Sequence, residues 1–308
     1  MIGTAALGRQ ELAIARSVLY AALFDYPLTL AQLRQTLIES EQTASQILTA
    51  YHRSDALRAL IDYRDGMFFP RGRGDFVAER RRRASRSRAF LRKHHALLAC
   101  ICAMPYVRMV ALSGSIAHLN LDRDGDLDLF IVTRGRHAWS VTVAVILLSK
   151  IMRRRRIVCA NYAVADTNLA FGQPDLFTAS QIIGLRPIVG SDLYRFLLAK
   201  NPFVYRFYPN FHGTSASSLA IRQSTLLARA KSAIETVLWG PSAVVEWLCR
   251  VAYGWHLRRR SSSWQSPEQV RLDVDCLKLH TSSHRHDVLD RFERSVDDAI
   301  RDAELIRL

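Results

Sequence analysis

Residues 111–133 read ALSGSIAHLNLDRDGDLDLFIVT, in which a Gly-Ser pair precedes a set of acidic residues and an apolar run follows it. The acidic residues stand at alternate positions: Asp122, Asp124, Asp126 and Asp128. Their spacing invites comparison with a calcium loop. Counted from the first aspartate, however, the sixth residue is Leu127 where such a loop needs glycine, and the twelfth is Thr133 where it needs glutamate. The stretch is therefore not an EF-hand.

The four aspartates divide into two pairs. Asp122 and Asp124 lie in NLDRDG, a polar turn sequence, and are interpreted as turn residues without chemistry. Asp126 and Asp128 begin the apolar segment DLDLFIVT, which is typical of a strand, and residues two apart on a strand project from the same face. Two adjacent carboxylates repel each other and lose solvation, so a cation between them is expected. Mg²⁺ suits such hard oxygen ligands.

Gly114 and Ser115 supply a phosphate site beside these acids. They follow the apolar segment VRMVAL and precede a short helical segment. At such a strand-to-helix turn, glycine permits close backbone approach, while free N–H groups and a hydroxyl can hold a phosphate. Ten residues separate Ser115 from Asp126, which is enough for a short helix and a return to the same site. A phosphate cradle with metal-binding acids indicates phosphoryl or nucleotidyl transfer.

The residues around this stretch alternate between strand and helix patterns over 106–165, which predicts an α/β unit with a small mixed sheet. The sequences LFTASQIIGLRPIVG and SDLYRFLLAKNPFVYRFYPN that follow are predicted to be helical. From about Ser217 the chain is predicted to be helical to its end, with breaks at Gly240-Pro241 and at SSSWQSP. The fold class expected is therefore α+β, with a C-terminal helical domain over 213–308 and a catalytic domain over 91–212.

The first 90 residues predict a winged-helix-like domain followed by a basic linker helix. That helix is expected to continue without a break through FVAERRRRASRSRAFLRKHHALLACICAMP and to end at Pro105. A helix from residue 9 ends near Pro27, and Thr29 with Gln32 forms a capping box for the next one. A third helical region covers about 44–63, and Asp65-Gly66 marks a hairpin. Helices followed by a hairpin outline a winged helix. Nucleic-acid binding and a purely structural or protein-contact function are both open for it.

The pattern of Gly114-Ser115, ten residues, and Asp126-Leu127-Asp128 with apolar flanks resembles the signature of the DNA polymerase β-like nucleotidyltransferase superfamily. The wider arrangement is similar to bacterial nucleotidyltransferase-domain proteins with an N-terminal winged helix. The resemblance implies that Gly114 and Ser115 contact a nucleoside triphosphate and that Asp126 and Asp128 hold one or two Mg²⁺ ions. It further implies transfer of a nucleoside monophosphate to an acceptor hydroxyl of a small molecule, a protein or an RNA, with release of pyrophosphate.

The third carboxylate of that superfamily is not evident. It is expected on the strand after the helix, here RIVCANYAVAD, where the mid-strand residue is Asn161 and the nearest acid is Asp166. Asp166 is assigned to the catalytic set, with Asp175 as the substitute. It also stays open whether the acceptor needs no protein base, or whether the domain binds nucleotide without turning it over. In the last case the protein is a nucleotide- or nucleic-acid-binding regulator.

Composition bears on partners and location. The 308 residues include 43 Lys and Arg against 28 Asp and Glu, a formal net charge of +15 with a pI near 10.2. This balance favours polyanionic partners, including nucleic acid through the basic surface and the winged helix, although arginines on solvated surfaces would also produce it. Five scattered cysteines indicate a reduced, cytoplasmic protein. The most apolar stretch, 138–152, is too short to cross a bilayer, and no membrane partner is expected.

Overall fold

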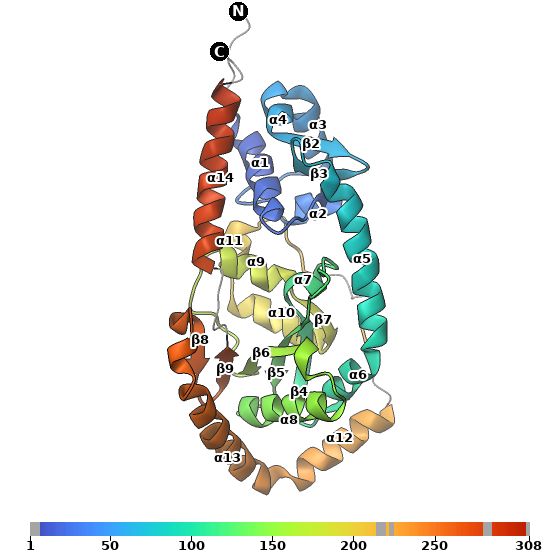
Figure 1. The fold of residues 1–308 in the computed structure, drawn as a ribbon, viewed down its shortest axis with the longest axis vertical. Helices are drawn as coiled ribbons and strands as arrows, with labels where there is room; N and C mark the ends of the chain where they lie inside the picture. Colours follow the sequence, from blue (N-terminus) through green and yellow to red (C-terminus); the bar gives the residue numbers. More distant parts are fainter. Residues whose placement is uncertain (1–6, 214–219, 222–224, 280–284, 306–308) are drawn as a thin grey trace, which may run out of the picture.

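The computed structural model describes residues 7–213, 220–221, 225–279 and 285–305 and shows an α+β fold. A three-stranded sheet lies near one end of the elongated molecule and a six-stranded sheet lies in its centre (Figure 1). Long helices run along the two sides, and two further helices close the end opposite the small sheet. None of the described helices is long and apolar enough to cross a membrane.

The N-terminal part builds the small sheet and the helices around it. Its elements are α1 (Arg9–Ala22), β1 (Leu28–Thr29), α2 (Leu30–Gln35), α3 (Ala44–Arg53), α4 (Asp55–Leu60), β2 (Ile61–Arg64) and β3 (Met67–Pro70). The strands are antiparallel in the order β1-β3-β2. The predicted capping box is present, because Thr29 N donates to Gln32 Oε1 at 3.1 Å and Gln32 N donates to Thr29 Oγ1 at 3.3 Å.

The hairpin between β2 and β3 is also as predicted. Asp65 and Gly66 form its turn with φ of 52° and 75°, the left-handed pair that a two-residue hairpin needs. The single helical region expected over about 44–63 is wrong in two places. Ser54 ends α3 and caps α4, since Leu57 N donates to Ser54 Oγ at 3.1 Å, and the chain becomes extended at Ile61.

The basic linker helix is divided in two. It consists of α5 (Asp75–Lys93) and α6 (His95–Ala103), with a break at His94, where φ is −107° and ψ is 12°. The first of these helices runs along one side of the molecule from the small sheet toward the large one (Figure 1). One continuous helix was expected here, and the break turns the apolar second half onto β4 of the central sheet.

The central sheet contains the Gly-Ser turn and the acidic pair. Its elements are β4 (Val107–Leu112), α7 (Gly114–Ala117), β5 (Leu127–Thr133), α8 (Ala138–Ile151), a 3-10 turn (Arg155–Ile157), β6 (Val158–Ala165), α9 (Leu176–Gly184), β7 (Arg186–Val189), α10 (Ser191–Lys200) and α11 (Val204–Phe207). The strand order is β7-β4-β5-β6-β9-β8. β5 is antiparallel to β4 and parallel to β6. The predicted mixed sheet is therefore present.

Both faces of this sheet are buried. On β5, Phe130 and Val132 face one core with α9 and α10, while Leu129 and Ile131 face the other core with α6 and α8. Residues 186–189 were expected to be helical, but they form β7 and pair with β4. Pro187 and the β-branched Ile188 and Val189 disfavour a helix there.

The C-terminal part is only partly helical. Its elements are α12 (Thr225–Val237), α13 (Trp239–Arg258), two 3-10 turns (Ser261–Ser263 and Pro267–Gln269), β8 (Val270–Leu272), β9 (Cys276–Leu279) and α14 (Arg285–Leu305). The predicted break at SSSWQSP is present, but Gly240 and Pro241 lie inside α13, and the expectation of helix after the second break is wrong because β8 and β9 follow it. β9 joins the central sheet by pairing antiparallel with β6, for example Tyr162 with Lys278. α14 then returns to pack against α1 and α4 of the N-terminal part.

Candidate active site

The turn after β4 lies directly against an aspartate of β5. Ser113 N donates to the carbonyl oxygen of Asp128 at 3.0 Å. Gly114 follows with φ +59°, and a Cβ added there would lie 2.5 Å from Asp128 Oδ2. Both the left-handed backbone and the missing side chain are therefore needed at this position. The predicted phosphate turn and the predicted metal-binding acid are thus in contact.

The pair at the start of β5 has a third neighbour that the sequence did not indicate. Ligand atoms of Asp126, Asp128 and Cys159 all lie within 4.8 Å of one another, and each residue is half-buried. Burial, and then the neighbouring Asp126 carboxylate, raise the pKa of Asp128 to about 6, while a hydrogen bond from the Cys159 side chain lowers it. The two carboxylates therefore repel each other. A cation bound between them would lower this repulsion.

A β-bulge places Cys159 beside the acids. Asp128 is opposite Cys159, but Phe130 is opposite Tyr162, so β6 contains one more residue than β5 in this interval. Alternate residues of a regular strand share a face, so without the bulge Ala160, two residues before Tyr162, would face the acids. In the structure Ala160 packs in the core on the opposite face of the sheet. Bulges of this kind re-aim a side chain and are common near active sites.

The donor set fits one hard cation better than two. Two carboxylates, with water and substrate phosphates completing the shell, are a usual Mg²⁺ arrangement. The third position holds a thiol, a soft ligand that Mg²⁺ does not favour. Since Cys159 hydrogen-bonds Asp128, it acts here as a neighbour of the carboxylate. The structure is therefore compatible with Asp126 and Asp128 as the metal-holding residues.

The structure does not bring Asp166, which the sequence assigned to the catalytic set, into this cluster. Thr133 stands five residues after Asp128 on β5, and its carbonyl oxygen accepts from Asp166 N at 2.8 Å. At about 3.3 Å per residue, Asp166 lies on the order of 17 Å from the pair, too far to share a cation. Asp166 Oδ1 instead accepts from Gly135 N at 2.9 Å, which fixes the turn after β5.

The substitute acid, Asp175, has a structural use. It caps α9, because its Oδ1 accepts from Thr178 N at 2.7 Å, and its Oδ2 accepts from Arg285 Nε at 2.9 Å. Burial raises the pKa of Asp175, but the bond from Thr178 and the Arg285 guanidinium outweigh it and hold this pKa below its usual value. The side chain of Asn161 lies outside the described residues.

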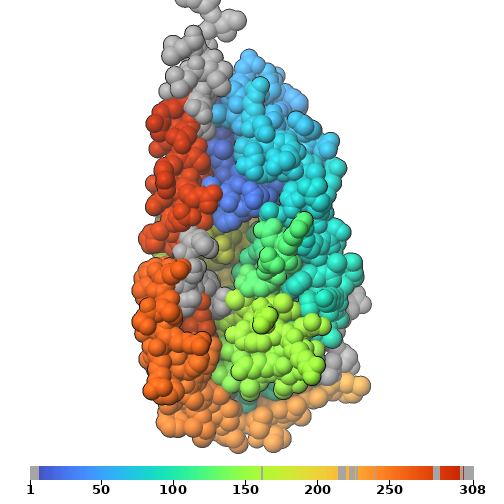
Figure 2. Space-filling view, in the orientation of Figure 1, coloured from blue at the N-terminus to red at the C-terminus, as the bar shows by residue number. Residues whose placement is uncertain are grey.

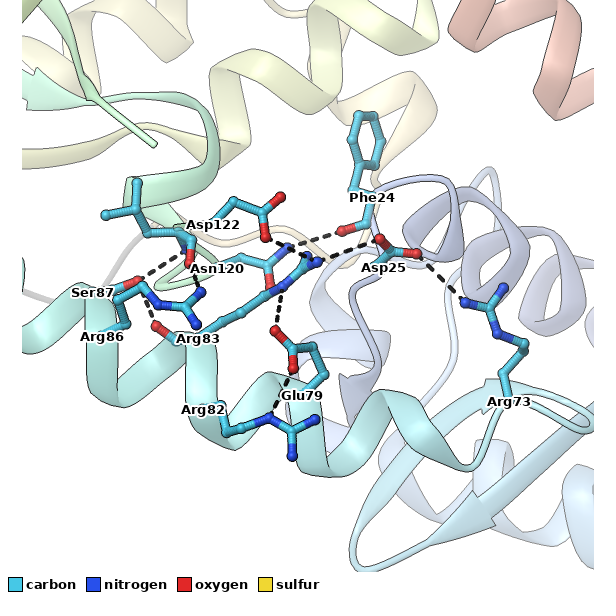
Figure 3. A network of polar contacts seen from close by, with 11 residues as sticks. Phe24, Asp25, Arg73, Glu79, Arg82, Arg83, Arg86, Ser87, Asn120 and Asp122 are labelled. Carbon is cyan, nitrogen blue, oxygen red and sulfur yellow. Dashed lines mark hydrogen bonds and ion pairs between the residues drawn. The ribbon is translucent and has the colours of Figure 1, made fainter. Parts of the chain in front are cut away.

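The turn before the acids is held by a polar network from α5 and the end of α1 (Figure 3). Arg83 forms ion pairs with Asp122 at 3.2 Å and with Asp25 at 3.6 Å. Leu121 N donates to Ser87 Oγ at 3.0 Å, and Asn120 Nδ2 donates to Phe24 O at 2.9 Å.

This network changes the interpretation of two features. Asp122 is exposed, as a turn residue was expected to be, but it is also an ion-pair partner of Arg83; Asp124 is exposed as well. The arginines of α5 are also not a uniform surface, since Arg86 Nη1 donates inward to Leu121 O at 3.0 Å. The ion pairs and hydrogen bonds together fix the segment that leads from α7 to Asp126.

A pocket of about 200 Å³ opens beside Asp128 and Cys159 on the α9 side of the sheet. Its aromatic wall is formed by Tyr162, Phe171 and Phe177, and its cationic wall by Arg271, Lys278 and Arg285. The cationic residues come from β8, β9 and the start of α14, so the C-terminal part completes a pocket that begins at β5.

Lys278 differs from the two arginines of this pocket because its hydrogen-bond acceptor is an amide oxygen and theirs are carboxylates. Arg271 and Arg285 pair with Asp273 and Asp175. The Lys278 ammonium instead donates to the amide oxygen Oε1 of Gln269 at 3.1 Å and lies 5.8 Å from the centre of the Tyr162 ring. Burial lowers the pKa of Lys278, with smaller contributions from Arg271 and Arg285. No sequence motif singled this residue out, because its position depends on the pairing of β9 with β6.

A second hollow of about 400 Å³ lies on the other side of the Gly114 turn, between the N-terminal part and the central sheet. Gly114 and Ser115 line it together with Tyr20, Ile183 and Tyr208. Gln181 of α9 lines both hollows. The contact between Gly114 and Asp128 therefore stands where two separate spaces approach each other.

Comparison of the chain with protein-family models, with curated proteins and with solved structures gives no match. Function is therefore inferred from the geometry of these residues.

Proposed function

We propose that the protein is a Mg²⁺-dependent nucleotidyltransferase of the DNA polymerase β-like superfamily. The observation that carries the proposal is the approach of the Gly114 backbone to the Asp128 carboxylate, with Asp126 beside it. A phosphate turn in contact with two metal-binding acids is what transfer of a nucleotidyl group requires. The antiparallel β4 and β5, joined through a short helix and followed by the parallel β6, also support the resemblance.

In the proposed reaction, an acceptor oxygen forms a bond to the α-phosphorus, the bond from that phosphorus to the β-phosphate oxygen breaks, and pyrophosphate leaves with its electron pair. Asp126 and Asp128 would hold the Mg²⁺ ion, which supplies neutralisation of the phosphate charge when bound. Gly114 allows the phosphates to reach backbone N–H groups because no Cβ stands in the way. Ser115 offers a hydroxyl at the same turn.

The two hollows give donor and acceptor separate places. The pocket with Lys278 suits the nucleotide, because the ammonium can pair with a phosphate and the rings of Phe171 and Phe177 can stack on a base. The triphosphate would extend from this pocket past Asp128 to the Gly114 and Ser115 turn, which lines the second hollow, and the acceptor would enter from that hollow. The nucleotidyl group would then be transferred beside Asp126 and Asp128.

A second candidate is a protein that binds the nucleotide without turning it over. It is favoured because the described residues place no third carboxylate in the cluster: Cys159 occupies the place beside Asp128, and Asp166 lies on the order of 17 Å away. In that case the acceptor hydroxyl finds no described carboxylate to take its proton. If turnover occurs, the proton passes to solvent or to the substrate.

We interpret the N-terminal part as a winged helix, because its strand order is β1-β3-β2 and its helices precede the hairpin. The charge of this part does not favour nucleic acid strongly. Residues 9–74 contain eight Arg and seven Asp or Glu, which leaves a net charge of only +1. Phosphate-backbone binding usually needs a basic surface. We therefore place catalysis in the central sheet and a structural function in the winged helix.

Calorimetry with ATP, GTP, CTP and UTP in the presence of Mg²⁺ tests the proposal. Asp126→Asn and Asp128→Asn should lower affinity for Mg²⁺ and triphosphate at least tenfold, as expected when a ligand to the cation is lost. Asp124→Asn is the matched control, because this exposed aspartate stands two residues from Asp126 and outside the cluster. Equal affinities for all three variants would refute the site.

Pyrophosphate release separates the two candidates. The wild-type protein should release pyrophosphate in the presence of a suitable acceptor, and Lys278→Met should weaken triphosphate binding while leaving Mg²⁺ binding intact. If triphosphate binds at the cluster but no pyrophosphate appears with water, small hydroxyl compounds, protein or RNA as acceptor, the binding function replaces the enzymatic one.

A further inference from the structure

Helix α13 presents an apolar stripe to the outside of the molecule. The stripe follows helical spacing and consists of Val244, Trp247, Leu248, Val251 and Trp255. These side chains are between 49% and 58% exposed, although they are among the largest apolar residues of the helix. The opposite face of α13 packs on α8, where Glu246 Oε1 accepts from Trp139 N at 3.0 Å and Gly254 is buried. The exposed stripe is therefore not needed for internal packing.

Helix α12 continues this surface. Leu226, Ile234 and Val237 are exposed and lie on one face of α12 by their spacing, and Leu238 follows between the two helices. The two helices together form the end of the molecule opposite the small sheet, and both lie at the surface on the face that Figure 2 shows. We call the exposed residues of α12 and α13 the apolar rim. Soluble surfaces seldom carry a continuous apolar area of this extent without a partner.

The helices of the apolar rim and the neighbouring α8 are strongly basic. Residues 134–156 and 225–260 contain thirteen Lys and Arg but only two acids, Glu235 and Glu246. Both acids are buried and used internally: Glu235 binds Tyr106 N at 2.7 Å and Arg134 at 3.0 Å, and Glu246 binds the start of α8. Within these two ranges, no described acidic side chain is therefore exposed to compensate the positive charge.

The basic residues stand close to the apolar ones. The Arg259 guanidinium lies 3.8 Å from the centre of the Trp255 ring, at the end of α13 where Arg258, Arg259 and Arg260 follow one another. On the neighbouring α8, Leu147 and Ile151 are exposed next to Lys150 and the run 153–156. Tryptophan and aliphatic side chains flanked by arginine are characteristic of helices that lie in the membrane–water interface.

We propose that the apolar rim docks the protein on the surface of an anionic lipid bilayer. The helices would lie along the surface, with Trp247 and Trp255 in the interface and the arginines against anionic headgroups. A second copy of the chain fits less well, because a symmetric contact would bring the same arginine runs together with no exposed acid of the two ranges to pair with them. The proposal departs from the expectation of no membrane partner, which rested on spanning length alone.

Sedimentation with lipid vesicles tests this proposal on the full-length chain. Wild-type protein should bind vesicles that contain phosphatidylglycerol, bind pure phosphatidylcholine vesicles much more weakly, and be released at high salt. The double variant W247S/W255S should bind the anionic vesicles at least tenfold more weakly. Phe196→Ser is the matched control, since Phe196 is a 63% exposed aromatic side chain on α10, outside the apolar rim, and it should bind as wild type does.

The same experiment also tests two other partners of the apolar rim, a second copy of the chain and RNA. Light scattering of the free protein and binding to RNA are measured alongside the vesicles, and unchanged thermal unfolding shows that each variant is folded. A wild-type dimer that W247S/W255S dissociates, with no vesicle binding, would assign the apolar rim to a second copy. Binding to RNA alone, or equal vesicle binding by W247S/W255S and Phe196→Ser, would equally overturn the proposal. None of these readouts depends on nucleotide binding.

Discussion

The contact between Gly114 and Asp128 makes the substitution Gly114→Ala a strong test of the site. Alanine at φ +59° costs about 1–2 kcal/mol of conformational strain. Its Cβ would also stand 2.5 Å from Asp128 Oδ2, so the carboxylate must turn away from its position beside Asp126. The strain acts on folding, whereas the displacement acts on the proposed metal site. We therefore expect a moderate loss of stability together with at least a tenfold loss of affinity for Mg²⁺ and triphosphate, or about 1.4 kcal/mol.

Gly135→Ala separates the two effects. Gly135 has φ +56°, almost the same as Gly114, but a Cβ there would have no heavy atom within 4 Å. Both variants should lose similar stability in thermal denaturation from the strain that they share. Only Gly114→Ala should lose affinity in calorimetry with Mg²⁺ and triphosphate. Equal affinities for the two variants would show that the Gly114 turn is not coupled to the acids, and the reasoning would fail.

Three further predictions concern stability. The raised pKa of Asp128, about 6, means that the folded state takes up a proton between about pH 4 and 6 that the unfolded chain does not, so stability falls as pH rises through this window. In scanning fluorimetry without divalent cations, Asp128→Asn should therefore have a higher melting temperature than the wild type near neutral pH, and this difference should become smaller in acid. A difference in melting temperature that does not depend on pH would contradict the prediction. Arg83→Ala should lower the free energy of unfolding in urea by about 1–3 kcal/mol, because the Arg83 side chain is only 13% exposed. Arg81→Ala should lower it by under about 1 kcal/mol, because Arg81 is 64% exposed. Similar losses for the two variants would show that the network in Figure 3 does not stabilise the fold. Glu235→Ala should lower the free energy of unfolding in urea by about 2–4 kcal/mol, because the buried Tyr106 N–H and the Arg134 guanidinium lose their acceptor. An unchanged free energy of unfolding would show that Glu235 does not hold α12 in place.

Local signals in the sequence predicted the elements that depend on near neighbours. The capping box of Thr29 and Gln32 and the Asp65-Gly66 hairpin need only a few consecutive residues, and both are present. The apolar runs of β4 and β5 predicted two strands, and the position of Gly114 between them predicted the turn. Helix boundaries were less accurate, as the breaks at Ser54 and His94 show, because backbone breaks there depend on the packing of the halves on different partners.

The residues that share the site with the acids could not be predicted in this way. Cys159 stands beside Asp128 because of a bulge in β6, and nothing in the sequence of that strand marks the extra residue. Lys278 reaches the pocket because β9 pairs with β6, more than a hundred residues earlier in the chain. Asp166, the nearest acid in the sequence, was expected at the site, but the parallel register carries it to the far end of the strand.

The sequence by itself determined that Gly114 precedes two acids that begin a strand, since this depends on spacing, backbone preference and the alternation of side chains. The tertiary structure alone decided what surrounds them: a thiol beside the two carboxylates, a pocket completed by the C-terminal strands, and an apolar rim that is exposed among the described residues. The physical reason is that strand register and helix packing are settled by the burial of residues far apart in the chain, and no local pattern records that choice.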